Sequence, residues 1–87
     1  MWQYSDDVAF VESGREVFCL STTDRSSRVV RISGSGVWIW ELLPGRTTSE
    51  VIAALQESSP DSARFEILSG TADFVRYLRE LGYIVER

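Results

Sequence analysis

The chain has 87 residues, of which 44% are hydrophobic and 25% charged, a balance typical of one folded domain. Its net charge of −4, with arginine as its only basic residue type, does not favour binding to a phosphate backbone. The absence of histidine and the single cysteine, Cys19, exclude an internal disulfide, Cys/His metal sites and histidine acid–base chemistry. We therefore predict one domain over residues 1–87 with no catalytic residue, no metal site and no cofactor.

No apolar run is long enough to span a membrane, and the first residues lack the basic start of a secretory signal. The sequence thus predicts a cytoplasmic protein without a membrane partner. Residues 1–6 are expected to form a tail, and two alternatives stay open for it: a flexible tail, or one that folds over the sheet.

Residues 8–12 and 16–21 are two short runs rich in β-branched and aromatic side chains. A Ser-Gly-Arg segment between them predicts a hairpin, because glycine supplies the positive φ of a tight turn. Cys19 lies in the second run between apolar neighbours, and we interpret it as a buried thiol without a chemical role.

A polar loop over residues 22–27 precedes a third predicted strand, residues 28–32. Alternation places Val30 and Ile32 on one face of this strand. If the three strands form a meander, the third strand lies on the outside and presents unpaired backbone groups along one edge. This free edge is a candidate binding surface.

Glycines after the third strand allow a sharp exit into a short apolar helix, residues 37–43, which Pro44 ends. We interpret Trp40 of this helix as a core residue, since large aromatic side chains dominate small cores. Thr47 and Glu50 have the spacing of a capping box, which predicts the start of a second helix.

Residues 58–70 show no clear apolar period and are left unassigned. From about residue 71, Phe74, Leu78 and Leu81 recur at helical spacing, which predicts a third helix with these side chains towards the core. The last residues are predicted to be briefly extended.

Three strands followed by three helices predict an α+β fold of winged helix-turn-helix type. Many winged helices bind DNA, but the unassigned residues 58–70 are far longer than the turn of roughly 3–4 residues in a DNA-reading helix-turn-helix. The third predicted helix also carries no net positive charge. We therefore predict no nucleic-acid partner and keep an acidic winged-helix regulator as the alternative from another class.

The order of elements resembles that of the PqqD-like proteins. The segment 32–55, with its Ile-Trp-Glu-Leu-Leu run and Gly45, and the closing segment 74–84 carry the resemblance. That family supplies peptide-recognition elements for the biosynthesis of ribosomally made, modified peptides. The resemblance implies a domain that binds a leader peptide and catalyses nothing.

The resemblance further implies that the leader peptide adds to the sheet as an antiparallel strand, facing the third helix. Backbone hydrogen bonds would supply affinity, and alternate side chains would supply selectivity. The implied peptide-binding residues are Arg28, Val29, Val30, Arg31 and Ile32 on the strand and Asp73, Phe74, Arg76, Tyr77, Leu78, Glu80 and Leu81 on the helix.

Within the family, an acidic free-standing chain of this length resembles the precursor-recognition protein of a lasso-peptide system. Its partners would be the leader peptide, a separate cysteine protease that removes the leader, and a cyclase. The alternative within the family is a peptide chaperone for a radical-SAM enzyme in quinone-cofactor biosynthesis.

Overall fold

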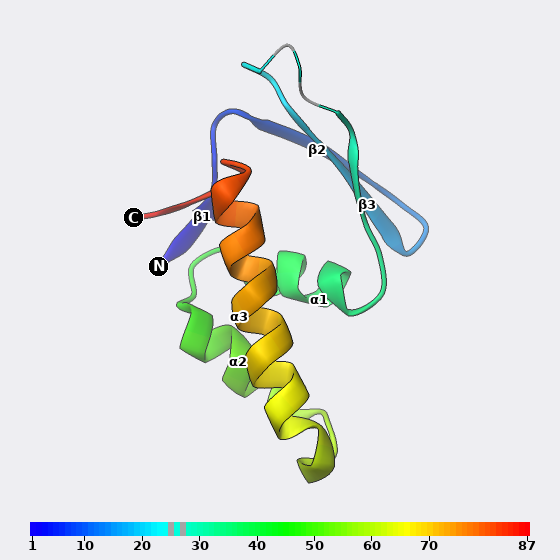
Figure 1. Cartoon of the computed structure of the whole chain (residues 1–87), viewed down its shortest axis with the longest axis vertical. Coiled ribbons are helices and arrows are strands. Elements are labelled where there is room, and N and C mark those ends of the chain that lie inside the picture. The colour runs from blue at the N-terminus through cyan, green and yellow to red at the C-terminus, as the bar shows by residue number, and fades with distance from the viewer. Residues whose placement is uncertain (25, 27) are drawn as a thin grey trace.

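The computed structural model describes residues 1–24, 26 and 28–87. Its elements in chain order are β1 (Trp2–Tyr4), β2 (Val8–Ser13), β3 (Glu16–Ser21), β4 (Val30–Ile32), α1 (Ser35–Leu42), α2 (Thr48–Glu57), the short 3-10 helix η1 (Asp61–Ala63), α3 (Arg64–Glu80) and β5 (Ile84–Glu86). Strands β2, β3 and β4 form an antiparallel sheet, and β1 pairs separately with β5 (Figure 1). The predicted α+β class of winged helix-turn-helix type is confirmed.

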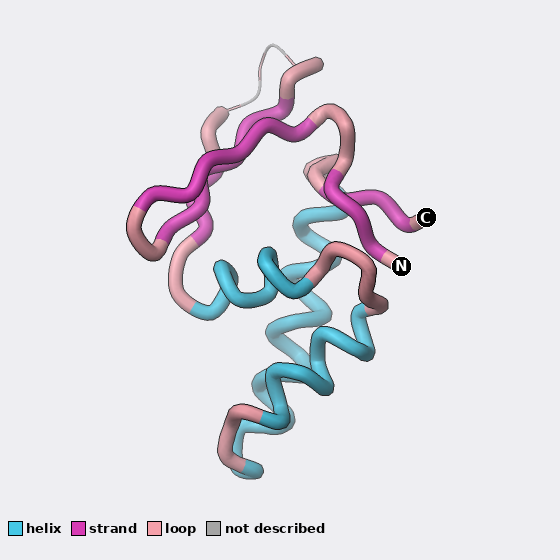
Figure 2. Tube along the Cα trace, turned by 180° about the vertical axis from the view of Figure 1, so that it is seen from behind, coloured by secondary structure: helices cyan, strands magenta, loops and turns pink. Residues whose placement is uncertain are grey.

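The three-stranded sheet lies at one end of the molecule, and α2 packs along α3 at the other (Figure 2). Helix α1 lies between these two ends. The β1–β5 pair brings both chain termini to one side, away from the turn of the β2–β3 hairpin. No helix in the described part of the chain is long and apolar enough to cross a membrane.

The predicted hairpin of β2 and β3 is present, and its turn has two residues, Gly14 and Arg15, since Ser13 still belongs to β2. Ser13 pairs with Glu16, and Gly14 between them has a φ of 64°. A positive φ at the first turn residue is characteristic of the type II′ turns that match the twist of the flanking strands. The predicted hairpin is therefore confirmed.

Strand β4 is shorter than the predicted strand over residues 28–32. Its pairing with β3 begins at Val30 and ends at Ile32, so Arg28 and Val29 precede the strand. Both of these residues are exposed, and they continue the polar loop although β3 extends to Leu20 and Ser21 beyond the last pair. Parts of the preceding predicted loop, residues 25 and 27, lie outside the described residues.

The N-terminus is a strand rather than a flexible tail. Residues Trp2–Tyr4 pair with Ile84–Glu86, and the Trp2 side chain is buried. The Trp2 backbone also exchanges hydrogen bonds with the loop after α1, donating to Arg46 O at 2.8 Å and accepting from Gly45 N at 2.9 Å. The predicted extended C-terminal segment is present and is the partner that orders the N-terminus.

The predicted capping box at the start of α2 is confirmed. Thr47 Oγ1 accepts from the Glu50 backbone N–H at 3.2 Å, and Glu50 Oε1 accepts from the Thr47 N–H at 3.0 Å. These bonds satisfy backbone donors that a helix start otherwise leaves without partners. Helix α1 begins at Ser35, two residues before its predicted start.

Helix α3 begins at Arg64, so the expectation of a long irregular link from 58 to 70 is wrong. Only residues 58–63 separate α2 from α3, and 61–63 of these form a 3-10 turn. The first half of α3 shows no clear apolar period because some of its large side chains face solvent, with Phe65 75% and Leu68 48% exposed. Linker length therefore gives no argument against a DNA-binding fold.

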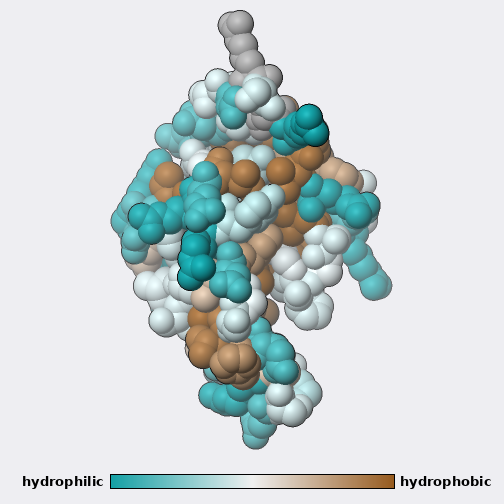
Figure 3. Space-filling model, viewed as in Figure 1, coloured by the Kyte–Doolittle hydropathy of each residue, from teal (hydrophilic) through white to brown (hydrophobic). Residues whose placement is uncertain are grey.

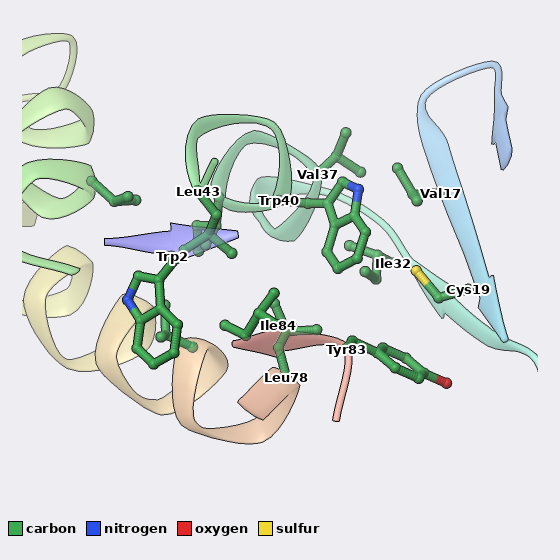
Figure 4. Close-up of a cluster of buried hydrophobic side chains, with 13 residues drawn as sticks. Trp2, Val17, Cys19, Ile32, Val37, Trp40, Leu43, Leu78, Tyr83 and Ile84 are labelled. Atoms are coloured by element: carbon green, nitrogen blue, oxygen red, sulfur yellow. The ribbon is translucent and has the colours of Figure 1, made fainter. Parts of the chain in front are cut away.

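The core gathers side chains from both sheets and all three helices (Figure 4). Trp40 is fully buried as predicted, its ring stacks on Tyr4 at 4.5 Å between centroids, and Tyr4 Oη donates to the Trp40 carbonyl at 2.7 Å. On α3 the buried side chains are Thr71, Val75 and Leu78, whereas Phe74 and Leu81 are only partly buried. The buried stripe of α3 is thus rotated from the predicted one.

Candidate functional site

Strand β4 is one of the two edge strands of the sheet, because the strand order is β2-β3-β4 and β4 pairs only with β3. The Thr22 N–H donates to Asp7 O at 2.8 Å, one step beyond the last register pair of β2 and β3. Hydrogen bonding alternates along an antiparallel pair. Even-numbered residues of β3 therefore bond to β2, and Val17 and Cys19 direct their backbone groups to β4.

Val17 and Cys19 lie opposite Ile32 and Val30, so both of these β4 residues use their backbone groups on β3. Arg31 lies between them and must present its N–H and C=O to the outside of the sheet. Within the described part of the chain, no residue pairs with these two Arg31 groups, so the edge offers one donor and one acceptor to an additional strand.

The Arg31 side chain lies on the outer face of the sheet. Its Nε is 3.2 Å from Glu16 Oε2, and both side chains are solvent-exposed. An exposed ion pair of this kind contributes little to stability, typically about 0–1 kcal/mol. The pair bridges β3 and β4 over the sheet face, where it does not cover the free backbone edge.

Helix α3 supplies an aromatic surface beside this strand. The Phe74 and Tyr77 rings are 6.4 Å apart between centroids, and Tyr77 is 46% exposed. A Cβ placed on Gly36 would lie 3.1 Å from Ile32 Cγ2 and 3.3 Å from Phe74 Cζ. Because Ile32 and Phe74 both adjoin this glycine, the end of β4 lies beside the Phe74–Tyr77 pair. We call the Arg31 edge together with this pair the strand–helix surface; apolar surface beside α3 is visible in Figure 3.

The other predicted helix residues lie at different depths. Leu78 is fully buried and supports the surface from beneath, and Leu81 is partly buried. Arg76 Nη1 is 3.5 Å from Asp73 Oδ1, and Arg76 follows Phe74 by two positions, which directs it away from the Phe74 face. Glu80 is exposed in the last turn of the helix.

Sequence reasoning missed residues on the same side of α3, one and two turns before Phe74. Ile67 and Gly70 line a hollow that also includes Phe74, and both fall in the stretch left unassigned. The signal that would have identified them is the helical spacing Ile67, Gly70, Phe74 and Tyr77, at steps of three and four residues. The surface therefore extends along α3 beyond the predicted residues.

The charged side chains of α3 balance one another. Helix α3 contains three arginines and three acidic residues. Burial raises the pKa of the Cys19 thiol to about 11 and that of Tyr4 to about 12, but both side chains belong to the core. Among the described residues, no three His, Cys, Asp or Glu side chains are grouped so that they could hold a metal ion.

A family model described as Coenzyme PQQ synthesis protein D (PqqD) matches residues 20–84, from the end of β3 to the start of β5. The chain belongs to the PqqD family. The resemblance noted in the sequence is thereby confirmed. No curated protein sequence matches the chain.

A solved structure described as "TbiB1 in Complex with the TbiA(beta) Leader Peptide" shares the PqqD-family fold of this chain. The two structures superpose with a TM-score of 0.78 at 25% sequence identity, over 98% of this chain and 96% of that chain. TbiB1 is thus similar to this protein over nearly its whole length, and the leader peptide in that complex is a ligand of TbiB1.

Proposed function

We propose that this protein binds the leader segment of a ribosomally made precursor peptide as an antiparallel strand on the Arg31 edge of β4. The observation that carries the proposal is the outward N–H and C=O of Arg31 beside the Phe74–Tyr77 pair, in which Phe74 is partly buried and Tyr77 is exposed. Strand β2 is also an edge of the sheet, but it lies at the side opposite β4 and lacks this aromatic neighbour. The likeness to TbiB1, which is described in complex with a leader peptide, supports the same function here.

We further propose that the bound leader is delivered in the cytoplasm to a separate cysteine leader protease and then to a cyclase, as part of lasso-peptide biosynthesis. The leader complex of TbiB1 supports the leader-binding part of this assignment, and the protease and cyclase steps are our proposal. The family description, which names coenzyme PQQ synthesis, favours a second candidate: a peptide chaperone for a radical-SAM enzyme in quinone-cofactor biosynthesis. In both pathways the protein acts by binding, and the chemistry belongs to its partners.

The charge of the protein disfavours the remaining candidate function, that of an acidic winged-helix regulator that binds DNA. The net charge is −4, and α3 has equal numbers of basic and acidic residues. Non-specific DNA affinity depends on cationic side chains that neutralise phosphates. A gel-shift experiment at low salt should show no saturable, salt-sensitive binding to duplex DNA, and such binding would support the regulator instead.

Arg31→Pro tests the peptide function. Proline removes the outward N–H, and prolines are tolerated on edge strands where that N–H faces away from the sheet. The matched control is Arg31→Ala, which removes the same side chain and its ion pair with Glu16 but keeps the N–H. Both variants should remain folded by circular dichroism.

A peptide selected on the wild-type protein from a random library, or the TbiA(beta) leader, serves as the ligand in fluorescence anisotropy titrations. Arg31→Pro should weaken binding by about tenfold or more, because one backbone hydrogen bond is lost and the ring obstructs the added strand. Arg31→Ala should bind within about threefold of wild type. Equal affinity of all three proteins would place the peptide elsewhere.

A further inference from the structure

Helix α3 has a second apolar side, which faces away from the strand–helix surface. Phe65, Leu68 and Ala72 recur at steps of three and four residues and therefore share one side of the helix. Phe65 precedes Phe74 by nine positions, and Leu68 precedes Tyr77 by nine. Nine residues are about two and a half helical turns, so the two apolar sides point in opposite directions. We call Phe65, Leu68 and Ala72 the outer stripe of α3.

The outer stripe is exposed to solvent. Phe65 is 75% exposed, more than any other large apolar side chain in the described part of the chain, and Leu68 is 48% exposed. Apolar surface is visible in Figure 3 at the end of the molecule that α2 and α3 form. The buried side chains of α3, Thr71, Val75 and Leu78, lie on another side of the helix. The outer stripe therefore has the pattern of a helix side that a further helix covers.

The outer stripe is complementary in size to a reversed copy of itself. If two α3 helices lie antiparallel with their midpoint between Leu68 and Ser69, Phe65 of each copy lies level with Ala72 of the other. Leu68 of each copy lies level with Ser69 of the other in the same way. Each layer then combines one large and one small side chain, which allows two helices to interdigitate at about 8–10 Å between their axes. Such a contact has the self-complementarity that a two-fold dimer requires.

Charged side chains at the two ends of the stripe are complementary in the same register. Asp61, in the 3-10 turn that leads into α3, precedes the stripe by four residues, and Arg76 follows it by four. The antiparallel register places Asp61 of each copy level with Arg76 of the other. A parallel pairing would instead oppose like charges at both ends, which is unfavourable.

The ion pairs that these two residues form within one chain are exposed. Arg64 Nη1 lies 3.9 Å from Asp61 Oδ1. Arg76 Nη1 lies 3.5 Å from Asp73 Oδ1. Exposed pairs of this kind hold their side chains only weakly. Asp61 and Arg76 are therefore free to pair with a second copy.

We infer that the outer stripe binds the outer stripe of a second copy of this chain, in an antiparallel helix pair with two-fold symmetry. This inference goes beyond the proposed function, because it needs no peptide. The stripe is short, so the dimer is weak, with a dissociation constant on the order of 0.1 mM. Because the strand–helix surface faces away from the contact, each copy keeps its own peptide site, and the dimer presents two.

Analytical ultracentrifugation of the full chain without peptide, between about 10 μM and 1 mM, tests the dimer. Wild type should shift from the mass of one chain towards that of two over this range. Leu68→Glu places a charge in the stripe and should weaken association by about tenfold or more. The matched control is Val11→Glu, which makes the same change of charge at a side chain of β2 that is 63% exposed. This control should associate as wild type does, and circular dichroism checks that both variants are folded.

Two charge variants test the antiparallel register. Asp61→Arg opposes arginine to arginine at both ends of its own dimer, and Arg76→Asp opposes aspartate to aspartate. Each variant alone should associate about tenfold more weakly than wild type. Mixed in equal amounts, the two should associate about as strongly as wild type, because each end of the mixed dimer then joins one arginine to one aspartate. The double variant Asp61→Arg/Arg76→Asp should regain association for the same reason.

Three outcomes would overturn the inference: wild type that is monomeric at about 1 mM, Leu68→Glu that associates as strongly as Val11→Glu, or a mixture of the two charge variants that associates no better than each alone. These measurements contain no peptide. A failure of the dimer therefore leaves the proposed function unaffected, and the Arg31→Pro titrations test that function separately.

Discussion

Trp2 Nε1 donates a hydrogen bond to Thr48 Oγ1 at 2.9 Å, so the first strand is fastened to the first residue of α2. The indole itself belongs to the core. Because β1 also pairs with β5, this one residue connects both ends of the chain with the helical part of the fold. Its contribution to stability has a polar part, the hydrogen bond to Thr48, and an apolar part, the buried indole ring.

Trp2→Phe should lower the free energy of unfolding by about 1–2 kcal/mol, since it removes the hydrogen bond and part of the ring but keeps an aromatic side chain. Trp2→Ala should cost about 3–5 kcal/mol, because it leaves a cavity where a core tryptophan was. Urea unfolding followed by circular dichroism measures both values. A value near zero for Trp2→Ala would mean that the N-terminus is not part of the folded core.

Tyr77→Ala should weaken peptide binding by about tenfold or more, as expected for loss of an aromatic contact in an interface. Tyr77 is 46% exposed, so its loss should change stability little. The matched control on the same helix is Arg76→Ala, which removes a side chain directed away from the Phe74 face. Isothermal titration of a selected peptide into each protein measures the effect, and equal losses for the two variants would contradict the assignment of Tyr77.

Cys19 should be chemically inert in the folded protein. Its side chain is buried, and burial raises the pKa of the thiol to about 11, so very little reactive thiolate is present at neutral pH. Iodoacetamide should therefore modify native protein far more slowly than urea-unfolded protein, as followed by mass spectrometry. Cys19→Ala should bind peptide within about threefold of wild type at some cost in stability. Rapid modification of the native protein would contradict this view.

Glu50 should make stability depend on pH in the acid range. The Thr47 N–H donates to its carboxylate and lowers the pKa of Glu50 in the folded state. A lowered pKa means that the stabilisation is complete above the unfolded value, about 4.3, and is lost as the pH falls through the folded value. Glu50→Gln keeps an acceptor for the capping box but has no titrating group.

Chemical unfolding of wild type and Glu50→Gln at several pH values between about 3 and 6 tests this expectation. The free energy of unfolding of wild type should exceed that of Glu50→Gln most at the upper end of this pH range, and the difference should shrink towards the lower end. A difference between the two proteins that does not vary with pH would show that the capping carboxylate is not linked to folding.

The sequence predicted those structural features whose signals lie within a few neighbouring residues. The Gly14 hairpin and the Thr47–Glu50 capping box are complete within a few residues, and both are present. Strand β1 has no such signal, because its partner is at the far end of the chain and Trp2 is buried only when Ile84 is paired nearby. Pairing over this distance cannot be read from one segment.

The candidate site likewise has one part that the sequence indicates locally and another that depends on distant parts of the chain. The predicted meander of three strands indicated a free edge at residues 28–32, but the outward direction of the Arg31 backbone follows only from the register of all three strands. The early start of α3 was missed because Phe65 and Leu68 are exposed apolar residues that blur its period. For the same reason the wall at Ile67 and Gly70 could not be assigned before the helix was seen.

The pairing of β1 with β5 also restricts the point at which the core of this protein can form. Met1 N lies 3.0 Å from Arg87 O, and the Arg87 N–H donates to Met1 O at 2.8 Å. Tyr83 and Ile84, which lead into this pair, are core residues. Until Ile84–Glu86 have been synthesised, Trp2 has no partner strand and the core lacks Tyr83 and Ile84. The core therefore cannot be complete before β5 is available, although all three helices precede β5 in the chain.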